Sequence, residues 1–586
     1  MNRLFYGDNL HVLQDTHAFP DASVDLIYLD PPFNSKRDYN LLFKSPVSGG
    51  RASRQAAADG SAGASPSNYT EAQITAFEDS WHWGEQAERE FDELLHQPNT
   101  DVAEMMKALR AFLGENDMMA YLTMMANRLL QLHRVLKPTG SLYLHCDPTA
   151  SHYLKIVLDG VMGKENFKTE ISWRRSAAHN DAKQGRKQYG NVRDVIFFYT
   201  KSDQWTWNWL YTPYTKEYLE AEYSHVGVDG RYFKETDPTA NKPGGDVSFE
   251  WRVKRRFVKG ARWEADLTDE YRKPVDGWEY LGVFPYQGRY WAYSKQNLIE
   301  FAKAGKLQHR KTGFPRIIQY ADEMPGVPLQ SDWQDIPPAL GDENMGYDTQ
   351  KPVALLERII AASSNEGDMV LDPFCGCGTA VHAAQKLKRQ WIGIDITHLA
   401  ISLIEKRLKD AFKTGLEFEV HGTPKDLASA RDFAKRDKYQ FQWWAVSLVE
   451  AQPFQGKKKG ADTGIDGLKF FRDVDQKDAR KIVVSVKGGE NLKADDVRSV
   501  MAVREREGAE IALFISLTEP TKGMVADAAS AGFYESANGR KFARVQLLTI
   551  EGLLSGKQRA EHPDYLPDLN FKKAKTEASG EQKKLL

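Results

Sequence analysis

Two short motifs carry residue types that could bind and modify an organic ligand. Residues 372–379 read Asp-Pro-Phe-Cys-Gly-Cys-Gly-Thr after a predicted strand, and Asp395 closes the next predicted strand about twenty residues on. Glycines let the backbone approach a ligand closely, and the later acid can accept hydrogen bonds from ribose hydroxyls. The spacing predicts a nucleotide-type site, with a tight turn that needs small residues as the alternative. The residues assigned to this site are Asp372, Pro373, Phe374, Gly376, Gly378, Thr379 and Asp395.

A dinucleotide dehydrogenase is the main rival for this loop. The third glycine of the dehydrogenase fingerprint is missing, and Asp-Pro-Phe precedes the loop, so a different adenosyl ligand is favoured. Cys375 and Cys377 are separated by one residue and have no partner pair nearby in the sequence. We therefore expect no metal at this loop.

The second motif, Asp30-Pro31-Pro32-Phe33, closes the apolar strand VDLIYLD. It should lie at the carboxyl edge of a sheet, where α/β proteins bind ligands. The prolines stiffen the loop and lack backbone donors, which leaves carbonyl acceptors pointing outward. An acid, a fixed carbonyl and an aromatic ring suit a planar substrate that bears an NH2 group. The alternative is a proline-stiffened turn capped by Asp30.

Alternating strands and helices surround both motifs, as an α/β sheet requires. Residues 1–165 contain predicted strands at LFYGDN, VDLIYLD and SLYLHCD, and apolar positions at helical spacing predict a helix over 118–135. Residues 341–425 return to this alternation around the glycine-rich loop. Residues 48–68 are rich in Gly, Ala and Ser, which predicts a flexible loop.

Together the motifs closely resemble those of amino-methylating DNA methyltransferases. The catalytic tetrapeptide of that family is Asp/Asn/Ser-Pro-Pro-Tyr/Phe, and its S-adenosylmethionine loop is Asp-Pro-Phe-x-Gly-x-Gly-Thr. Here the catalytic motif comes first, which is the order of the β class and of the modification subunits of type III restriction systems. Tyr6-Gly7-Asp8-Asn9 and Thr349-Gln350-Lys351-Pro352 are supporting matches. The resemblance covers most of residues 1–425.

This resemblance implies a Rossmann-like S-adenosylmethionine-dependent methyltransferase fold with an inserted target-recognition module. It also implies site-specific methyl transfer to the N6 amine of an adenine flipped out of double-stranded DNA, in a restriction-modification or defence system. N4 of cytosine stays open, although an acid at the first motif position favours adenine. A homodimer and a separate restriction subunit are partners that the family allows. The implied catalytic residues are Asp30, Pro31, Pro32 and Phe33, which would stack on the base, and Asp8 and Lys351 would join the cofactor site.

Residues 166–340 have a different composition and are predicted to be the target-recognition module. They hold nine of the fourteen tryptophans and the basic run Trp251-Arg252-Val253-Lys254-Arg255-Arg256. Short β-like pieces separated by Gly and Pro dominate this segment. Arg and Lys can contact phosphates and guanine edges, and aromatic rings can wedge or stack. We expect most of the tryptophans to lie in the core.

Residues 436–560 predict a further α/β domain that resembles the Mrr-like restriction endonuclease folds, whose motif is Asp followed by Glu/Gln-x-Lys. Metal-dependent nucleases place an acid and a lysine on neighbouring strands in this way. The candidate nuclease residues are Glu450, Asp466, Ser485 and Lys487, with Mg2+ at Asp466. Ser485 stands where the family has Glu or Gln, so an inactive remnant in a DNA-binding regulator competes with a combined endonuclease and methyltransferase.

The net charge of −2, from 79 basic and 81 acidic residues, argues at first against a nucleic-acid partner. Basic clusters in the middle module and at residues 457–459 remove that objection. No run of about 18 apolar residues and no apolar leader occur, so we expect no membrane association. Three cysteines suit a reducing, cytoplasmic location. The tail at 561–586 is predicted to be disordered.

Overall fold

The structure is a computed structural model in which the described residues form two compact units. One unit comprises Met1–Asn208 and Gln330–Gly580, and the other comprises Trp209–Leu329. The described residues are 1–32, 38–44, 71–78, 81–176, 187, 189–227, 229–242, 249–267, 275–341, 343–345, 347, 349–413, 415–454, 464–474, 478–563 and 574–577. Phe33 and the predicted loop at 48–68 lie outside them.

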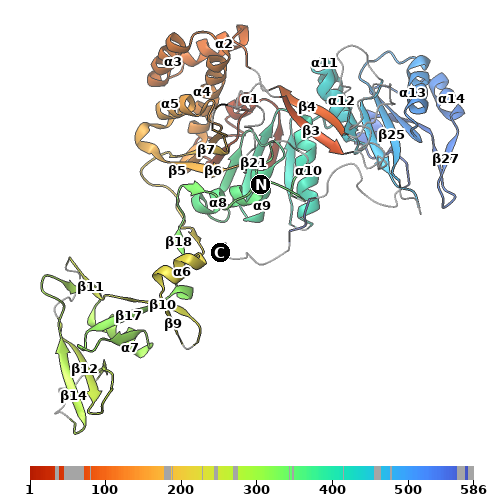
Figure 1. Cartoon of the computed structure of the whole chain (residues 1–586). Coiled ribbons are helices and arrows are strands. Elements are labelled where there is room, and N and C mark those ends of the chain that lie inside the picture. Colours follow the sequence, from red (N-terminus) through yellow and green to blue (C-terminus); the bar gives the residue numbers. More distant parts are fainter. Residues whose placement is uncertain are drawn as a thin grey trace. The chain divides into compact units, whose positions relative to one another are not determined.

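A nine-stranded sheet organises the first unit, in the order β19-β6-β7-β5-β2-β20-β21-β1-β22. Four of its strands, β5, β6, β7 and β21, are labelled in Figure 1. Its strands are Asp332–Trp333 (β19), Phe167–Arg174 (β6), Arg193–Thr200 (β7), Leu136–Cys146 (β5), Val24–Leu29 (β2), Met369–Asp372 (β20), Gln390–Asp395 (β21), Asn2–Tyr6 (β1) and Phe418–His421 (β22). All neighbouring pairs are parallel except those that β7 makes with β5 and β6. The predicted α/β fold with a Rossmann-like sheet is confirmed.

The two sequence halves that carry the motifs interleave in this sheet. β2 pairs with β5 on one side and with β20 on the other, with Leu26 opposite Val370 and Ile27 opposite Leu371. Because β2, β20 and β21 are parallel neighbours, their carboxyl ends lie together at one edge. The residues that follow these strands are therefore brought together.

Apolar helices complete the core of this sheet. The predicted helix at 118–135 is α4 (Asp117–Val135), which shares the core with α5 (Ser151–Met162) and with β2 and β5. Residues 85–113 carry no element predicted from the sequence, yet they form α2 (Glu85–Leu95) and α3 (Thr100–Leu113). Ala87, Phe91 and Leu94 are buried at helical spacing on α2, and α2 packs against α4. The remaining helices of this part are α1 (Asn9–Gln14), α8 (Val353–Ser363), α9 (Thr379–Lys386) and α10 (His398–Ala411).

The second unit is built from short strands, as its sequence predicts. One sheet has the order β16-β17-β10-β9, and another has the order β13-β12-β14. The bounds are Leu307–His309 (β16), Pro315–Tyr320 (β17), Tyr232–Thr236 (β10), His225–Val226 (β9), Glu264–Ala265 (β13), Trp251–Arg256 (β12), Trp278–Val283 (β14), Lys216–Glu222 (α6) and Lys295–Lys303 (α7). Trp251, Trp263 and Trp291 are buried in its core.

This unit is narrower than the predicted recognition module of 166–340. β6, β7 and β19 fall inside those predicted bounds but belong to the nine-stranded sheet of the first unit. Trp173 and Trp333 are buried there, and their strands pair with each other. The tryptophans of 166–340 are therefore divided between two hydrophobic cores, one in each unit. Composition alone could not show this division.

A second α/β sheet forms near the C-terminus, in the order β23-β24-β25-β26-β29. Its strands are Gln452–Pro453 (β23), Gly467–Phe471 (β24), Arg480–Lys487 (β25), Ile511–Ser516 (β26) and Val545–Thr549 (β29). The helices are Leu427–Arg436 (α11), Lys438–Ser447 (α12), Ala494–Arg506 (α13), Lys522–Ser530 (α14) and Ile550–Leu554 (α15). Two buried clusters cover the sheet, and one of them includes residues of α11 and α12.

Part of the tail predicted to be disordered is held against the first unit. Ala574 is buried, and the Glu577 carboxylate lies 3.1 Å from His382 Nε2 and 3.2 Å from Lys386 Nζ on α9. A histidine and a lysine one helical turn apart thus anchor Glu577, with burial lowering the pKa of His382 to about 4. Of the helices in the described ranges, none has the length and apolar character that a membrane span requires.

Candidate active site

Three acidic residues meet at the carboxyl edge of the nine-stranded sheet. Asp30 follows β2, Asp372 ends β20 and Asp395 ends β21, and these strands are neighbours. They line a cavity of about 280 Å³. The predicted site residues in its lining are Asp8, Asp30, Pro31, Pro32, Lys351, Asp372, Pro373, Phe374, Gly376, Thr379 and Asp395. Gly378 lies just behind the lining as the N-cap of α9, and Phe33 is outside the described residues.

The two Asp30 oxygens have different surroundings. Oδ2 accepts a hydrogen bond from Lys351 Nζ at 2.5 Å, and the Lys351 side chain is only 9% exposed. Oδ1 is buried and accepts no hydrogen bond from any residue that the structure describes. An unsatisfied buried acceptor is costly, and one that lines a cavity fits a donor brought by a ligand. Lys351, predicted to serve the cofactor, is thus in contact with the predicted catalytic acid.

A buried polar chain lies behind Asp30. The Tyr28 hydroxyl, which lines the cavity, is 2.9 Å from His145 Nδ1, and His145 Nε2 is 3.2 Å from Asp194 Oδ2. Hydrogen bonding to His145 lowers the pKa of Asp194 against the opposing effect of its burial. The hydrogen bonds connect β2, β5 and β7, so they fix the strand from which Asp30 emerges.

Backbone geometry shapes the glycine-rich loop. Gly376 and Gly378 have φ of 49° and 76°, a region that favours glycine. The Gly376 amide donates to Asp395 Oδ2 at 2.9 Å, which ties the loop to the end of β21. Arg407 Nη1 donates to the Cys377 carbonyl and to Thr379 Oγ1 at 3.0 and 3.2 Å, which holds the start of α9.

The two acids on β20 and β21 are shielded from water. Burial raises the pKa of Asp395 to about 6, and hydrogen bonds from Thr397 and Gly376 offset this effect only in part. Burial also raises the pKa of Asp372 well above its usual range, and Asp372 Oδ1 caps the Phe374 amide at 3.1 Å. Asp395 lines the cavity with a carboxylate that can accept hydroxyl hydrogens.

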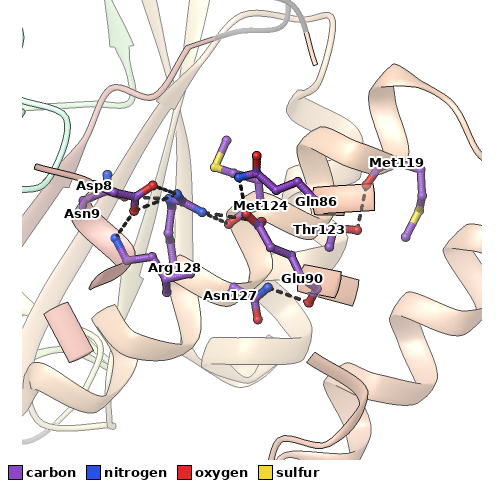
Figure 2. A network of polar contacts seen from close by, with 10 residues as sticks. Asp8, Asn9, Gln86, Glu90, Met119, Thr123, Met124, Asn127 and Arg128 are labelled. Atoms are coloured by element: carbon purple, nitrogen blue, oxygen red, sulfur yellow. Dashed lines mark hydrogen bonds and ion pairs between the residues drawn. The ribbon is translucent and has the colours of Figure 1, made fainter. Parts of the chain in front are cut away.

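Arg128 is the site residue that sequence reasoning missed. It lies on α4 with a side chain 6% exposed, and it lines the cavity. Figure 2 shows its guanidinium between Asp8 and Asn9 on one side and Glu90 of α2 on the other. The position of Arg128 within the apolar run of 118–135 is the sequence signal that could have found it, because a buried arginine requires polar or acidic partners. Tyr28 and Gln86 are further lining residues that the motifs did not reveal, and Asn9, quoted in the Tyr6-Gly7-Asp8-Asn9 match without a role, also lines the cavity.

The C-terminal candidates come together only in part. Asp466 Oδ2 accepts from the Val486 amide at 2.6 Å, so this acid is next to the segment that holds Ser485 and Lys487. Lys487 Nζ lies 3.5 Å from Asp496 Oδ1. Glu450 is 84% exposed and lies 3.6 Å from Lys469 Nζ. Within the described ranges no group of three or more His, Cys, Asp or Glu side chains is arranged to hold a metal ion.

An α/β sheet with a glycine-rich loop, a following strand that ends in an acid, and a cavity at the carboxyl edge defines a class of enzymes with nucleotide-type ligands. The chain belongs to the DNA methylase family, whose model matches residues 24–406. Residues 433–554 match the restriction endonuclease family Mrr_cat. Both resemblances predicted from the sequence are confirmed.

The relatives carry restriction-modification names. The type II methyltransferase M.EcaI of Enterobacter cloacae is 29% identical over 290 residues, which are 49% of this chain and 57% of that protein. The Mod subunit of the type III enzyme StyLTI of Salmonella typhimurium is 24% identical over 66% of this chain and 50% of the subunit. The chain thus spans little more than half the length of these relatives. The solved M1.HpyAVI–SAM complex covers 70% of this chain and 99% of its own, at 14% identity and a TM-score of 0.29.

The close packing of Gly378 predicts a measurable cost for adding one methyl group. A Cβ at Gly378 would lie 2.7 Å from Ile404 Cγ1, whereas a Cβ added at Gly367, which has a φ of 89°, would meet nothing within 4 Å. Gly367→Ala is therefore a matched control for backbone strain alone. We expect Gly378→Ala to cost about 1–3 kcal/mol more than Gly367→Ala, seen as a lower Tm in thermal denaturation. Equal Tm values for the two variants would contradict this expectation.

Proposed function

We propose that the protein is an S-adenosylmethionine-dependent DNA methyltransferase of a restriction-modification or defence system, acting on the N6 amine of adenine. The observation that carries this proposal is the buried, unpartnered Oδ1 of Asp30 in a cavity that also contains the glycine-rich loop. Asp30 presents an acceptor for an amino group. The glycine-rich loop and Asp395 present the features of an adenosyl site. Family membership and the relatives' names support the same reaction class.

The residues present fit S-adenosylmethionine. Gly376 has no side chain, so the loop keeps an open approach beside the Tyr347 ring, which a Cβ would meet at 3.5 Å. Asp395 sits at the strand end where ribose hydroxyls are bound in such folds. When bound, the cofactor supplies an electrophilic methyl group on a sulfonium.

Asp30 is proposed to activate the target amine. Its free Oδ1 would accept one amino hydrogen, and the Pro31 carbonyl would accept the other, which favours a pyramidal nitrogen aimed at the methyl group. Lys351 holds Oδ2, so that Oδ1 keeps its direction. Transfer of the methyl group from the sulfonium to the amine would leave the nitrogen with one proton too many, and Asp30 Oδ1 would be placed to accept that proton.

Double-stranded DNA is the proposed partner. The amine is inaccessible inside a duplex, so the base must be flipped out, at a cost of roughly a few kcal/mol, with Phe33 proposed to stack on it. The aromatic and basic segment at 166–340 is proposed to read the sequence. The basic side chains of β12 are proposed to contact phosphates, although three of them already lie within ion-pair distance of Glu250, Glu264 or Glu279; the four are Arg252, Lys254, Arg255 and Arg256. A separate restriction subunit and a homodimer remain proposals for the assembly.

Adenine is favoured over cytosine by the acid at the first position of Asp30-Pro31-Pro32-Phe33. The two amines are chemically alike, so N4-cytosine methylation is the alternative. Sequencing that reports modified bases in DNA from expressing cells gives both the base and the site. N6-methyladenine at a fixed sequence supports the proposal, and N4-methylcytosine supports the alternative.

Asp30→Asn tests the catalytic assignment. We expect methyl transfer to fall by about 10²–10³-fold or more, because the proton acceptor is lost, while cofactor binding measured by calorimetry is retained. Asp159→Asn is a control outside the cavity lining, since Asp159 also pairs with a lysine, Lys155, at 2.8 Å. The control should keep activity. Full methylation by a folded Asp30→Asn variant would refute the role of Asp30.

The raised pKa of Asp395 predicts a pH-dependent cofactor affinity. The ionised carboxylate is the better acceptor for ribose hydroxyls, and its pKa in the free protein is about 6. As pH falls through 6, Asp395 takes up a proton, and the Kd for S-adenosylmethionine should rise by up to about tenfold per pH unit. Asp395→Asn should bind more weakly with a flat profile. Calorimetry between pH 5 and 8 measures the Kd for S-adenosylmethionine of the unmodified chain and of Asp395→Asn. If the two Kd values changed with pH in the same way, this expectation would be contradicted.

DNA cleavage by the C-terminal domain is the second candidate function. The family match at 433–554 and the placement of Asp466 against the strand that ends in Lys487 favour it. One carboxylate and the Ser485 hydroxyl are a small donor set, which fits Mg2+ only if phosphate and water oxygens complete the shell. When bound, Mg2+ would polarise the phosphate.

Asp466→Ala separates a nuclease from an inactive remnant. Unmethylated plasmid incubated with the full chain and Mg2+ should be nicked or cut, and the variant should lose this activity, because Asp466 is the acid next to Lys487. Asp527→Asn, which removes an ion pair with Arg498 in the same domain, is the control and should still cut. Absence of cutting by the unmodified chain would favour the remnant.

A further inference from the structure

Arg128 connects the separate segments that form the cofactor half of the cavity. Its Nη2 donates to both oxygens of Asp8 at 3.1 and 3.0 Å, and its Nε donates to Asn9 Oδ1 at 2.6 Å. Nη1 donates to the Met124 carbonyl of its own helix at 3.1 Å and lies 3.9 Å from Glu90 on α2. One planar guanidinium thus contacts the N-terminal loop and faces α2 from α4 (Figure 2).

Asn9 extends this network to the glycine-rich loop. Asn9 Nδ2 donates to the Pro373 carbonyl at 2.8 Å, in a buried hydrogen bond. Pro373 directly follows Asp372, and the neighbouring Gly7 amide donates to the Asp395 carbonyl at 3.0 Å. The loop at residues 7–9 therefore touches the ends of both β20 and β21. Arg128 determines how its two polar side chains are oriented.

The far side of the network reaches the cavity through α2. Gln86 Nε2 donates to Glu90 Oε1 at 3.1 Å, and Gln86 itself lines the cavity. Asn127, next to Arg128 on α4, donates to the Glu90 carbonyl at 2.8 Å. A continuous series of polar contacts therefore runs from Gln86 through Glu90 and Arg128 to Asn9 and Pro373. It joins two walls of the cavity without touching Asp30.

We propose that Arg128 is the positioning residue for S-adenosylmethionine, setting cofactor affinity rather than the chemical step. This inference rests on the proposed function. Losing the guanidinium would leave Asp8 and Glu90 without the cation between them and Asn9 Oδ1 without its donor. The side chains of Asp8 and Asn9 would then be held less firmly, although the Gly7 amide and Asn9 Nδ2 keep their bonds to Asp395 and Pro373. A lysine keeps the charge but offers donors from a single atom, so it cannot span Asp8, Asn9 and Met124 together.

The expected signature separates positioning from general support of the fold. Arg128→Lys and Arg128→Ala should raise the Kd and KM for S-adenosylmethionine by about tenfold or more, as loss of residues that orient a binding site does. At saturating cofactor, kcat and the KM for DNA should stay close to those of the unmodified chain. Asn9→Ala, which leaves Arg128 in place, should show the same pattern and should not add fully to Arg128→Lys.

Arg134→Ala is the matched control. Arg134 lies on the same helix and makes the same kinds of bond, to Asp21 and to the carbonyls of Leu13 and Phe19. It should lower the Tm and leave the cofactor Kd unchanged. Calorimetry with S-adenosylmethionine and the full chain gives the deciding comparison. If the unmodified chain binds no cofactor, the proposed function fails. If it does bind, the inference is overturned by either of two results: the Arg128 and Asn9 variants bind S-adenosylmethionine as well as the unmodified chain, or Arg134→Ala weakens binding as much as they do.

Discussion

The parallel pairing of β2 with β20 is the constraint on which the rest of the site depends. It joins segments about 340 residues apart, with Leu26 opposite Val370 and Ile27 opposite Leu371. This pairing places Asp30 and Asp372 at one edge and brings Lys351, just before α8, within reach of Asp30. A one-residue slip would turn every side chain of the strand to the other face. Loop closure costs grow only slowly with length, so the pairing tolerates a whole unit inserted between its strands.

Two physical devices keep so many acids together in the lining. Asp30 and Asp8 each have a buried cation, Lys351 and Arg128 respectively. Asp372 and Asp395 instead have their pKa raised by burial, so each holds its proton to a higher pH than an exposed acid would. A carboxylate paired with a cation is held in a fixed orientation and keeps its charge. A carboxyl group whose pKa is raised responds instead to pH and to ligands that donate hydrogen bonds. The cavity therefore combines a rigid half with a titratable half.

Sequence reasoning located the strand ends but not the network behind them. Asp30, Asp372 and Asp395 could be predicted, because each follows an apolar strand and strand ends converge in parallel sheets. Arg128 could not, because its partners lie about 40 and 120 positions away and only tertiary contact reveals them. The helices at 85–113 were missed although apolar residues recur at helical spacing on both, so this signal was present in the sequence and was not used. Composition also assigned β6 and β7 to the middle module, although pairing with β5 places β7 in the large sheet.

The endonuclease-family segment is packed against the edge of the sheet that carries Asp395. The His398 amide, three residues beyond Asp395, donates to Gln440 Oε1 of α12 at 3.2 Å. The Tyr6 ring, beside the loop that Arg128 orients, contacts the rings of His398 and Phe433 at 5.5 and 5.6 Å. Burial lowers the pKa of His398 to about 3, so this contact stays uncharged at neutral pH. The methylase and endonuclease segments are therefore joined by side-chain contacts at this edge, in addition to the chain that connects them.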